Sequence, residues 1–430
     1  MTTQLTTEFQ TDEAFARSLD AADPLAKYRE QFLFPTSEDG TPLTYLCGNS
    51  LGLQPKTAAA MVTREMEDWA KLAVNAHLGG RNPWYTYHEQ FRDPIARVVG
   101  AEPREVVVMN ALTVNLHLLL TTFYQPTKTR FRIIMEAPAF PSDTYALKTH
   151  LQTRGLDPAE SLIIVNPREG EHTLRTEDIE AVIEEQGDSL ALLWIGGINF
   201  LTGQAMDMAR LTKAAHAVGA VAGFDLAHAA GNLDLRLHDW EVDFAVWCSY
   251  KYLNAGPGAP GGVFIHEKHA KNTNLPRYGG WWGNDPNTRF QLHLLPEFIP
   301  RDSADAWQIS NPPILSLAPL RAALDIFDEA TMPALRKKSL ALTEYLRWLL
   351  EQNPQGNYEI ITPREPESHG CQLSILINQN PKERHTALAR AGVTVDFREP
   401  NVIRVAPAPL YNSFLDVWKF VQVLSPSMNQ

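Results

Sequence analysis

The sequence predicts an α/β protein: a large domain with a mainly parallel sheet covered by helices, followed by a smaller C-terminal α+β domain. Between about residues 105 and 248, short and fully apolar segments alternate with helical patterns. This alternation is typical of a parallel sheet whose crossover connections are helices. After Pro312-Pro313 the pattern changes to long helical stretches and then to several short strands, which indicates a second domain.

The large domain is predicted from the period of its apolar residues. Strands are expected at 105–110, 131–135, 161–165, 190–195, 220–224 and 244–248. Helices are expected at 56–77, 112–124, 145–154, 176–185 and 208–218. In such sheets ligands bind beyond the carboxyl ends of the strands, so the residues that follow each strand are the candidates for a functional site.

The smaller domain is predicted with helical patterns over 315–352, around 383–391 and around 414–424, and with strands near 358–361, 372–377, 393–396 and 403–406. The first 55 residues are polar and interrupted by proline and glycine, which favours an arm. The predicted division is an N-terminal arm (1–55), a large domain (56–311) and a small C-terminal domain (312–430).

Composition excludes several classes of protein. The formal net charge of -12 argues against nucleic acid or an anionic membrane as a partner. Cys47, Cys248 and Cys371 are the three cysteines, and no two of them form a CxxC pair, so a zinc site built from cysteines is not expected. No metal is predicted. The first 20 residues resemble no secretory signal and no apolar run is long enough to span a bilayer, so the protein is expected to be cytoplasmic.

Two segments place polar side chains at the carboxyl ends of predicted strands. The strand at 220–224 ends in Asp225, and the strand at 244–248 leads into Lys251 and a turn rich in glycine and proline. Taken alone, Asp225 could cap the next helix, and Lys251 could be an ordinary surface lysine. If Lys251 is buried, its pKa falls and its amine becomes a usable nucleophile.

Together the two segments indicate a specific cofactor. Pyridoxal phosphate needs a lysine for its aldehyde carbon and a carboxylate against its pyridine nitrogen, so that the ring can accept electrons from a carbanion. Adjacent strand ends of one parallel sheet can supply both groups. The sequence therefore predicts a pyridoxal-phosphate enzyme in which Lys251 forms the Schiff base and Asp225 holds the ring nitrogen.

A phosphate site is predicted where the strand at 105–110 turns into a helix at Leu112 and Thr113. The free N–H groups at the start of a helix suit an anion, and the hydroxyls of Thr113 and Tyr250 could add donors. A plain helix N-cap is the alternative. After the next strand, Phe140 could stack on the pyridine ring or belong to the core.

Arg404 lies within an apolar strand pattern. A buried arginine needs a carboxylate partner, which could be an internal acid or the carboxylate of an amino-acid substrate. His77, His228 and Asn311 are each as compatible with a structural role as with binding. The pair Trp281-Trp282 between glycines could form a binding wall or fill an interface.

Several motifs along the chain resemble the kynureninase family. They are GNSLGLQPK, MNALTVNLH, AFPSD, FDLAHAAGN, WCSYKYLNAG, ISNPPIL and IRVAPAPLYNS, and the similarity extends from Tyr45 to about Phe420. The resemblance implies the fold of the aspartate-aminotransferase-like enzymes (PLP-dependent transferase-like, fold type I) with pyridoxal 5'-phosphate as cofactor. It also implies a homodimer whose sites are shared between subunits.

The resemblance assigns roles to individual residues. It gives Lys251 and Asp225 the roles already predicted and makes Tyr250 a phosphate contact and acid–base group. The other cofactor contacts that it implies are Leu112, Thr113, Phe140, Pro141, Ser142, Asp143 and His228 and, across the dimer, Trp281 and Asn311. Arg404 matches the arginine that holds the substrate α-carboxylate, and His77 and Asn311 match residues near the aromatic end of the substrate.

The activity implied is the hydrolytic cleavage of the Cβ–Cγ bond of L-kynurenine, or of 3-hydroxy-L-kynurenine, in tryptophan degradation or NAD synthesis. One position departs from the pattern, because Gly196 lies where some members have a serine near the cofactor. Another fold-type-I enzyme, an aminotransferase or a cysteine desulfurase, is the nearest alternative. A desulfurase would need a mobile catalytic cysteine, whereas Cys248 and Cys371 lie in apolar strand patterns.

Overall fold

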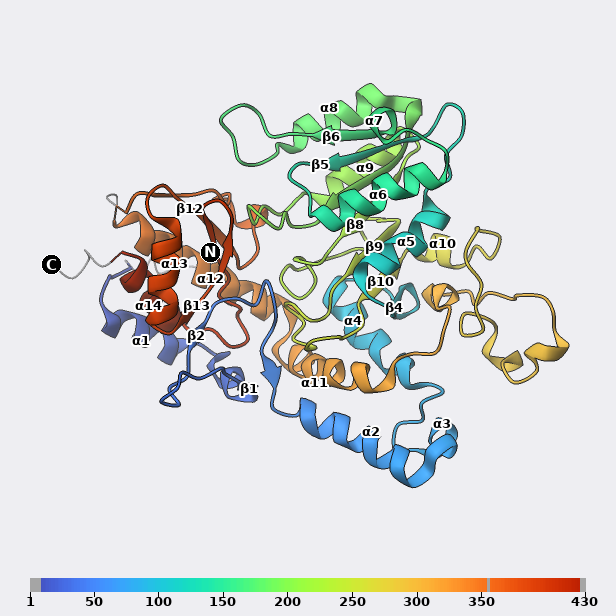
Figure 1. Ribbon diagram of the computed structural model, residues 1–430, viewed down its shortest axis with the longest axis horizontal. Coiled ribbons are helices and arrows are strands. Elements are labelled where there is room, and N and C mark those ends of the chain that lie inside the picture. Colours follow the sequence, from blue (N-terminus) through green and yellow to red (C-terminus); the bar gives the residue numbers. More distant parts are fainter. Residues whose placement is uncertain (1–8, 354–355, 426–430) are drawn as a thin grey trace, which may run out of the picture.

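The computed structural model describes residues 9–353 and 356–425. Within them the chain forms a seven-stranded sheet with helices on both faces and a separate four-stranded sheet (Figure 1). Residues 1–8 of the predicted arm, and residues 354–355 and 426–430 of the predicted small domain, lie outside the described residues. Among the described helices, none has both the length and the apolar composition that a bilayer span requires.

The large sheet has the strand order β4-β10-β9-β8-β7-β5-β6. Its strands are β4 (Val106–Val108), β5 (Arg132–Glu136), β6 (Leu162–Val165), β7 (Leu190–Gly196), β8 (Val221–Asp225), β9 (Phe244–Trp247) and β10 (Gly262–Ile265). β10 runs antiparallel to β4 and β9, and the other pairs are parallel. All strands except β10 therefore end at the same edge of the sheet.

Helices cover both faces of this sheet (Figure 1). One layer contains α5 (Leu112–Phe123) and α6 (Pro141–Thr153), and the other contains α4 (Arg92–Val99), α8 (Thr176–Gln186), α9 (Met208–Ala217) and α11 (Ile314–Ala330). In β7, Leu192 and Trp194 pack in the first layer, and Leu193 and Ile195 pack in the second. This period of two, with all four side chains buried, explains why the strand is a continuous apolar run.

The smaller sheet has the order β11-β12-β15-β14. Its elements are β11 (Tyr358–Ile360), β12 (Leu373–Ile377), β14 (Asp396–Arg398) and β15 (Val402–Val405), with helices α12 (Met332–Glu351), α13 (Pro381–Arg390) and α14 (Phe414–Leu424). The helical stretch predicted at 315–352 is divided between α11 and α12, because Thr331 adopts a φ of 63°.

The N-terminal segment packs against the C-terminal part of the chain and forms a two-stranded sheet with it. Helix α1 (Glu13–Ala22) packs on α14, and β2 (Thr44–Tyr45) pairs in parallel with β13 (Val393–Thr394); α1 and α14 lie together at one end of the molecule in Figure 1. The remaining early elements are β1 (Phe32–Leu33), β3 (Gln54–Pro55), α2 (Ala58–Leu72) and α3 (Ala76–Gly79), and the short helices α7 (Pro158–Ser161) and α10 (Glu267–Ala270) complete the chain. The division at residues 55 and 311 stays a prediction.

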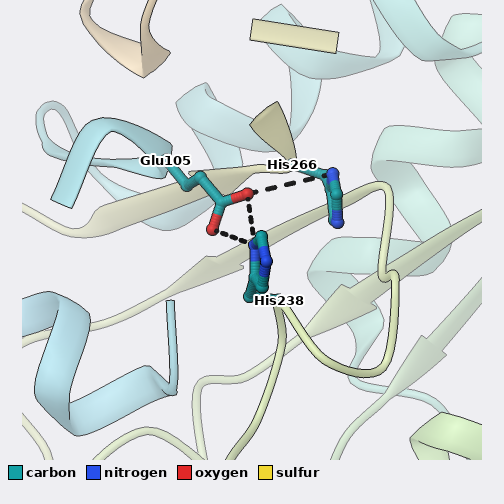
Figure 2. A group of neighbouring side chains, drawn as sticks. All are labelled: Glu105, His238 and His266. Atoms are coloured by element: carbon teal, nitrogen blue, oxygen red, sulfur yellow. Dashed lines mark hydrogen bonds and ion pairs between the residues drawn. The ribbon is translucent and has the colours of Figure 1, made fainter. Parts of the chain in front are cut away.

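Glu105, directly before β4, connects three segments of the large domain (Figure 2). Its fully buried carboxylate accepts the backbone N–H groups of Glu102 at 2.9 Å and Glu267 at 2.7 Å. It also lies 3.0 Å from Nδ1 of His238 and 3.8 Å from Nδ1 of His266. The two imidazole rings stack with centroids 5.0 Å apart.

The ligand atoms of Glu105, His238 and His266 lie within 4.8 Å of one another, a spacing that could hold a metal ion. However, both carboxylate oxygens already accept backbone N–H groups. Nδ1 of His266 accepts the N–H of Lys268 at 3.2 Å. Because the lone pairs are engaged by donors of the chain, we interpret the group as a hydrogen-bonded clamp.

The clamp gives a stability prediction. Glu105→Gln replaces an acceptor oxygen with an amide N–H that faces a backbone donor, so we expect the free energy of unfolding to fall by about 2–4 kcal/mol. The hydrogen bond to Glu105 raises the pKa of His238 in the folded protein. The stability that this bond contributes is therefore fully present below the pKa that His238 has in the unfolded chain, and it is lost as pH rises through the pKa of His238 in the folded protein. Urea denaturation at several pH values measures both effects.

The control for this prediction is Glu160→Gln, the same change at an exposed position, which should alter stability by no more than about 0.5 kcal/mol. Equal stability of Glu105→Gln and wild type would contradict the clamp.

Candidate active site

A cavity opens at the edge of the large sheet where the parallel strands end. It is lined by residues that end or follow β5, β7, β8 and β9 and by the first residues of α5 and α6: Ala111, Leu112, Thr113, Glu136, Phe140, Ser142, Asp143, Gly196, Ile198, Phe200, Asp225, Ala227, His228, Cys248, Tyr250 and Lys251. Parallel α/β sheets bind their ligands at this edge. Most of the residues predicted to contact the cofactor thus lie around one cavity.

Asp225 is the last residue of β8, and Lys251 follows the neighbouring strand β9. The Asp225 carboxylate accepts the N–H of Ala227 at 2.7 Å and is buried. Burial raises the pKa of Asp225, and the positive charge of Lys251 partly offsets the increase. Burial also lowers the pKa of Lys251, which favours a reactive amine near neutral pH.

His228 lies beside the lysine. Its Nε2 is 3.0 Å from Nζ of Lys251, and its Nδ1 has no hydrogen-bond partner among the described residues. Burial and the charge of Lys251 lower the pKa of His228. The imidazole is therefore neutral, and its Nδ1 is free for a ligand.

Two helices begin at the cavity. The N-cap residues Ala111 of α5 and Phe140 of α6 make no side-chain hydrogen bond to the first turn of their helices. The hydroxyl groups of Thr113 and Ser142, one from each helix, lie 2.8 Å apart. Free backbone N–H groups, two helix dipoles and two hydroxyls converge here, which suits a phosphate group.

Phe140 stands over the cavity and is not part of the core. Its ring is 42% exposed, lies 5.9 Å from Nζ of Lys251 and contacts the ring of Phe200 edge-on at 5.4 Å. An exposed aromatic face at this place is available to stack on a planar ligand.

Arg404 is buried beneath the cavity, on β15. Its Nε pairs with Asp396 at 2.8 Å and its Nη1 donates to the carbonyl oxygen of Phe200 at 2.7 Å. The internal acid is thus one partner of Arg404, while Nη2, which has no acceptor among the described residues, is available to a substrate carboxylate. Its bond to Phe200, which lines the cavity, places it beside the lining, and its positive charge contributes to the lowered pKa values of Lys251 and His228.

Five of the candidates do not line this cavity, namely Arg404 and four others. His77 is exposed on α3, where Nδ1 donates to the Val74 carbonyl oxygen and the ring contacts Trp84. Trp281 is 44% exposed and packs edge-on against Trp282. Asn311 and Pro141 are exposed, and Pro141 opens helix α6.

These features fit pyridoxal phosphate. Nδ1 of His228 and Oδ1 of buried Asp143 have no partner in the described chain, and no side chain caps the first turn of α5. Buried polar groups normally have partners. A phosphate would accept hydrogen bonds at the helix starts, and a cationic ring nitrogen would donate to Asp225. The carbonyl carbon of the cofactor would bond to the amine of Lys251.

The sequence has close curated relatives. It is 56% identical to the kynureninase of Myxococcus xanthus over 97% of both chains, and 51% identical to that of Koribacter versatilis over 98% of this chain and 99% of the relative. The chain belongs to the kynureninase family. Residues 335–424 match the family described as Kynureninase C-terminal domain. The family that the sequence motifs indicated is thus confirmed.

Solved structures share the fold of this kynureninase-family chain at low identity. A cysteine desulfurase from Escherichia coli aligns with a TM-score of 0.73 at 17% identity, covering 94% of this chain and 98% of its own. The C-DES protein, in a structure with glycine covalently linked to pyridoxal phosphate, aligns with a TM-score of 0.74 at 16% identity, covering 92% of this chain and 99% of its own. The predicted fold type I is confirmed.

Sequence reasoning missed Glu136, Phe200 and Ile198, which also line the cavity of this kynureninase-family protein. For Glu136 a signal was present: an acidic residue closes the apolar strand β5, just as Asp225 closes β8. Phe200 and Ile198 follow β7 in an apolar segment, and nothing in their sequence distinguishes them from core residues.

The paired hydroxyl groups of Thr113 and Ser142 give a prediction about phosphate binding in this kynureninase-family protein. Removing both hydroxyls in Thr113→Val/Ser142→Ala should weaken the binding of pyridoxal phosphate by about 1–3 kcal/mol, measured by titrating the protein with the cofactor and following its visible absorbance. Thr121→Val, near the other end of α5, removes a hydroxyl that donates to the Leu118 carbonyl oxygen and should bind as wild type does. Unchanged binding by the double variant would contradict the phosphate cradle.

Proposed function

We propose that this chain is a kynureninase that hydrolyses the Cβ–Cγ bond of L-kynurenine, 3-hydroxy-L-kynurenine or both, with pyridoxal phosphate in the cavity at the sheet edge. The observation that carries this proposal is identity of 56% to a curated kynureninase over 97% of the chain. The enzyme is a hydrolase acting on carbon–carbon bonds. The products are L-alanine and anthranilate or 3-hydroxyanthranilate, in tryptophan degradation or NAD synthesis.

When bound, pyridoxal phosphate supplies an electron sink for the negative charge that develops on the substrate carbons. Asp225 would hold the proton of the ring nitrogen, since its carboxylate is buried at the end of β8 with one backbone partner. Thr113, Ser142 and the starts of α5 and α6 would hold the phosphate. Phe140 would cover one ring face. These assignments are supported by the cavity lining and by the uncapped helices.

Lys251 is our candidate for carrying the cofactor and for removing the Cα proton of the substrate. Burial lowers the pKa of its amine, so a larger fraction is neutral and able to accept a proton. Tyr250 is our candidate for proton donation in the later steps. Burial raises the pKa of the Tyr250 phenol, which keeps its proton available near neutral pH.

Substrate binding is assigned to Arg404, with the free Nη2 directed to the α-carboxylate. Hydrolysis then requires one water molecule. Its hydroxyl adds to the γ-carbonyl carbon, the Cβ–Cγ bond breaks, and a proton is delivered to Cβ, which leaves a benzoate-type acid and alanine.

A cysteine desulfurase is not favoured although the fold is shared. Cys47, Cys248 and Cys371 are all buried. Burial raises the pKa of Cys248, and it raises the pKa values of Cys47 and Cys371 to about 12. A thiolate nucleophile needs the opposite conditions. The three free thiols are also the support for the proposed cytoplasmic location.

A homodimer with shared sites is part of the proposal. Large apolar side chains are exposed on the segment after α10, which extends away from the sheet in Figure 1, namely Tyr278, Trp281, Phe290, Leu294, Leu295, Phe298 and Ile299. Trp69, Val74 and Leu78 are also exposed, on and next to α2 and α3. Apolar surface of this kind is typical of an interface, and a second copy is the commonest partner.

The function is tested with the purified protein and each substrate. We expect release of anthranilate from kynurenine, or of 3-hydroxyanthranilate from its 3-hydroxy form, together with alanine, measured by the fluorescence of the aromatic product. Lys251→Ala should lose the visible absorbance of the bound cofactor and lower kcat by more than about 10³-fold. Lys148→Ala, an exposed lysine on α6, is the control. Amino-group transfer or sulfide release, without the aromatic product, would refute the proposal.

The shared site is tested by mixing two inactive variants. If Trp281 reaches the partner's cavity, Lys251→Ala and Trp281→Ala subunits should form mixed dimers in which one site is intact. After co-refolding at equal amounts, about a quarter of wild-type activity should return. No recovery, in dimers shown by mass to be mixed, would mean that Trp281 acts within its own subunit.

A further inference from the structure

Glu136 is a buried carboxyl group in the cavity to which the proposed mechanism gives no role. It is the last residue of β5, and 5% of it is exposed. Because β5, β7 and β8 are neighbours in the sheet, their ends place Glu136, Gly196 and Asp225 in a row. The register of β7 and β8 pairs Gly196 directly with Asp225.

Gly196 allows Glu136 to approach the main chain of β7. Oε1 of Glu136 accepts the N–H of Gly196 at 3.0 Å. A Cβ atom at position 196 would lie 2.9 Å from the same oxygen, closer than side chains normally approach. In this chain the space beside residue 196 is thus taken by the Glu136 carboxyl group.

Acidic side chains outnumber basic ones in the lining of the cavity around this carboxyl group. Glu136, Asp143 and Asp225 all line the cavity, and Lys251 is the one lysine or arginine in that lining. Burial raises the pKa of Glu136 to about 7, and the neighbouring charge of Asp225 adds to the increase. Burial and the charges of Asp225 and Glu136 likewise raise the pKa of Asp143. The other titratable side chains of the lining are His228, Cys248 and Tyr250.

We propose that Glu136 is a further cofactor-binding residue, a second carboxyl group that keeps its proton in the empty cavity and releases it when the positively charged ring of the cofactor binds beside Asp225. The reasoning is electrostatic: a cation brought to a buried acid favours the ionised form of that acid. The proposal rests on the cofactor of the proposed function and is independent of the substrate.

Linkage gives the direction of the effect. At low pH, binding must remove the proton from Glu136, and the carboxylate contributes little to affinity. Above the pKa of the empty protein the carboxylate is already ionised and contributes in full. Glu136→Gln stays neutral at every pH and lacks this contribution. The ratio of the two dissociation constants cancels the titration of the phosphate, which is the same in both measurements.

The experiment measures the dissociation constant of pyridoxal phosphate for wild type and Glu136→Gln across the pH range around neutrality, by absorbance titration. We expect the ratio, variant over wild type, to rise with pH from near one to about tenfold, since each unit of pKa shift corresponds to tenfold in affinity. Glu136→Asp keeps the charge and should restore most of the rise. Calorimetry in buffers of different ionisation enthalpy should show that wild type releases more protons on binding than Glu136→Gln.

The matched control is Glu65→Gln. Glu65 is another buried glutamate, and it accepts hydrogen bonds from Asn82 and Trp84 away from the cavity. The ratio of the dissociation constants of Glu65→Gln and wild type should not change with pH. A flat or falling ratio for folded Glu136→Gln would overturn the inference. Should that variant fail to fold, the infrared carboxylic-acid band of wild type decides: loss of the band on adding the cofactor at low pH supports the inference, and an unchanged band overturns it. A wild-type protein that binds no pyridoxal phosphate would instead overturn the proposed function.

Discussion

Asp225 and Lys251 carry opposite charges into one buried cavity, and neither charge would be stable there alone. Desolvation opposes both ionised forms, as the raised pKa of Asp225 and the lowered pKa of Lys251 show. The pair can exist because β8 and β9 are parallel neighbours that end at the same edge. The N-terminal segment supports the lysine turn from the other side, where Gly52 donates its N–H to the Tyr250 carbonyl oxygen at 2.8 Å. A Cβ at Gly52 would lie 2.3 Å from the Lys251 carbonyl oxygen, so the turn requires glycine there.

The same parallel order produces the rest of the site. Two of the strands that end at this edge, β4 and β5, are followed by short turns into helices, so α5 and α6 begin where these strands end. Their uncapped first turns give the cavity a positive side made of backbone N–H groups. Glu136, Asp143 and Asp225 give it a negative side. A ligand with an anionic group at one end and a cationic ring atom at the other fits this separation of charge, whatever reaction follows.

Sequence patterns could predict these positions because an acid or a lysine that closes an apolar strand is unusual. That reasoning found Asp225 and Lys251, and it would have found Glu136 had it been applied to β5. It missed β10, whose four apolar residues lie beyond the glycine-rich turn, because β10 is antiparallel and no helix precedes it. It could not place His77, Trp281 or Asn311, because their roles come from resemblance alone. The clamp at Glu105 could not be predicted either, since three of its partners, His238, His266 and Glu267, are 133 to 162 residues away in sequence.

Fold type I serves several reactions, and the neighbours at 16–17% identity include a desulfurase, so the walls of the cavity must select the chemistry. Arg404 illustrates how. Asp396 engages Nε and the Phe200 carbonyl engages Nη1, which leaves Nη2 without an acceptor in the described part of the chain. Nη1 and Nη2 each carry a further N–H, so an end-on grip of a carboxylate, the stronger geometry, can form while the bond to Phe200 is kept. The Phe200 ring contacts the Phe140 ring edge-on at 5.4 Å. Phe200, which follows β7, therefore connects the arginine proposed to hold the substrate carboxylate with the ring proposed to stack on the cofactor.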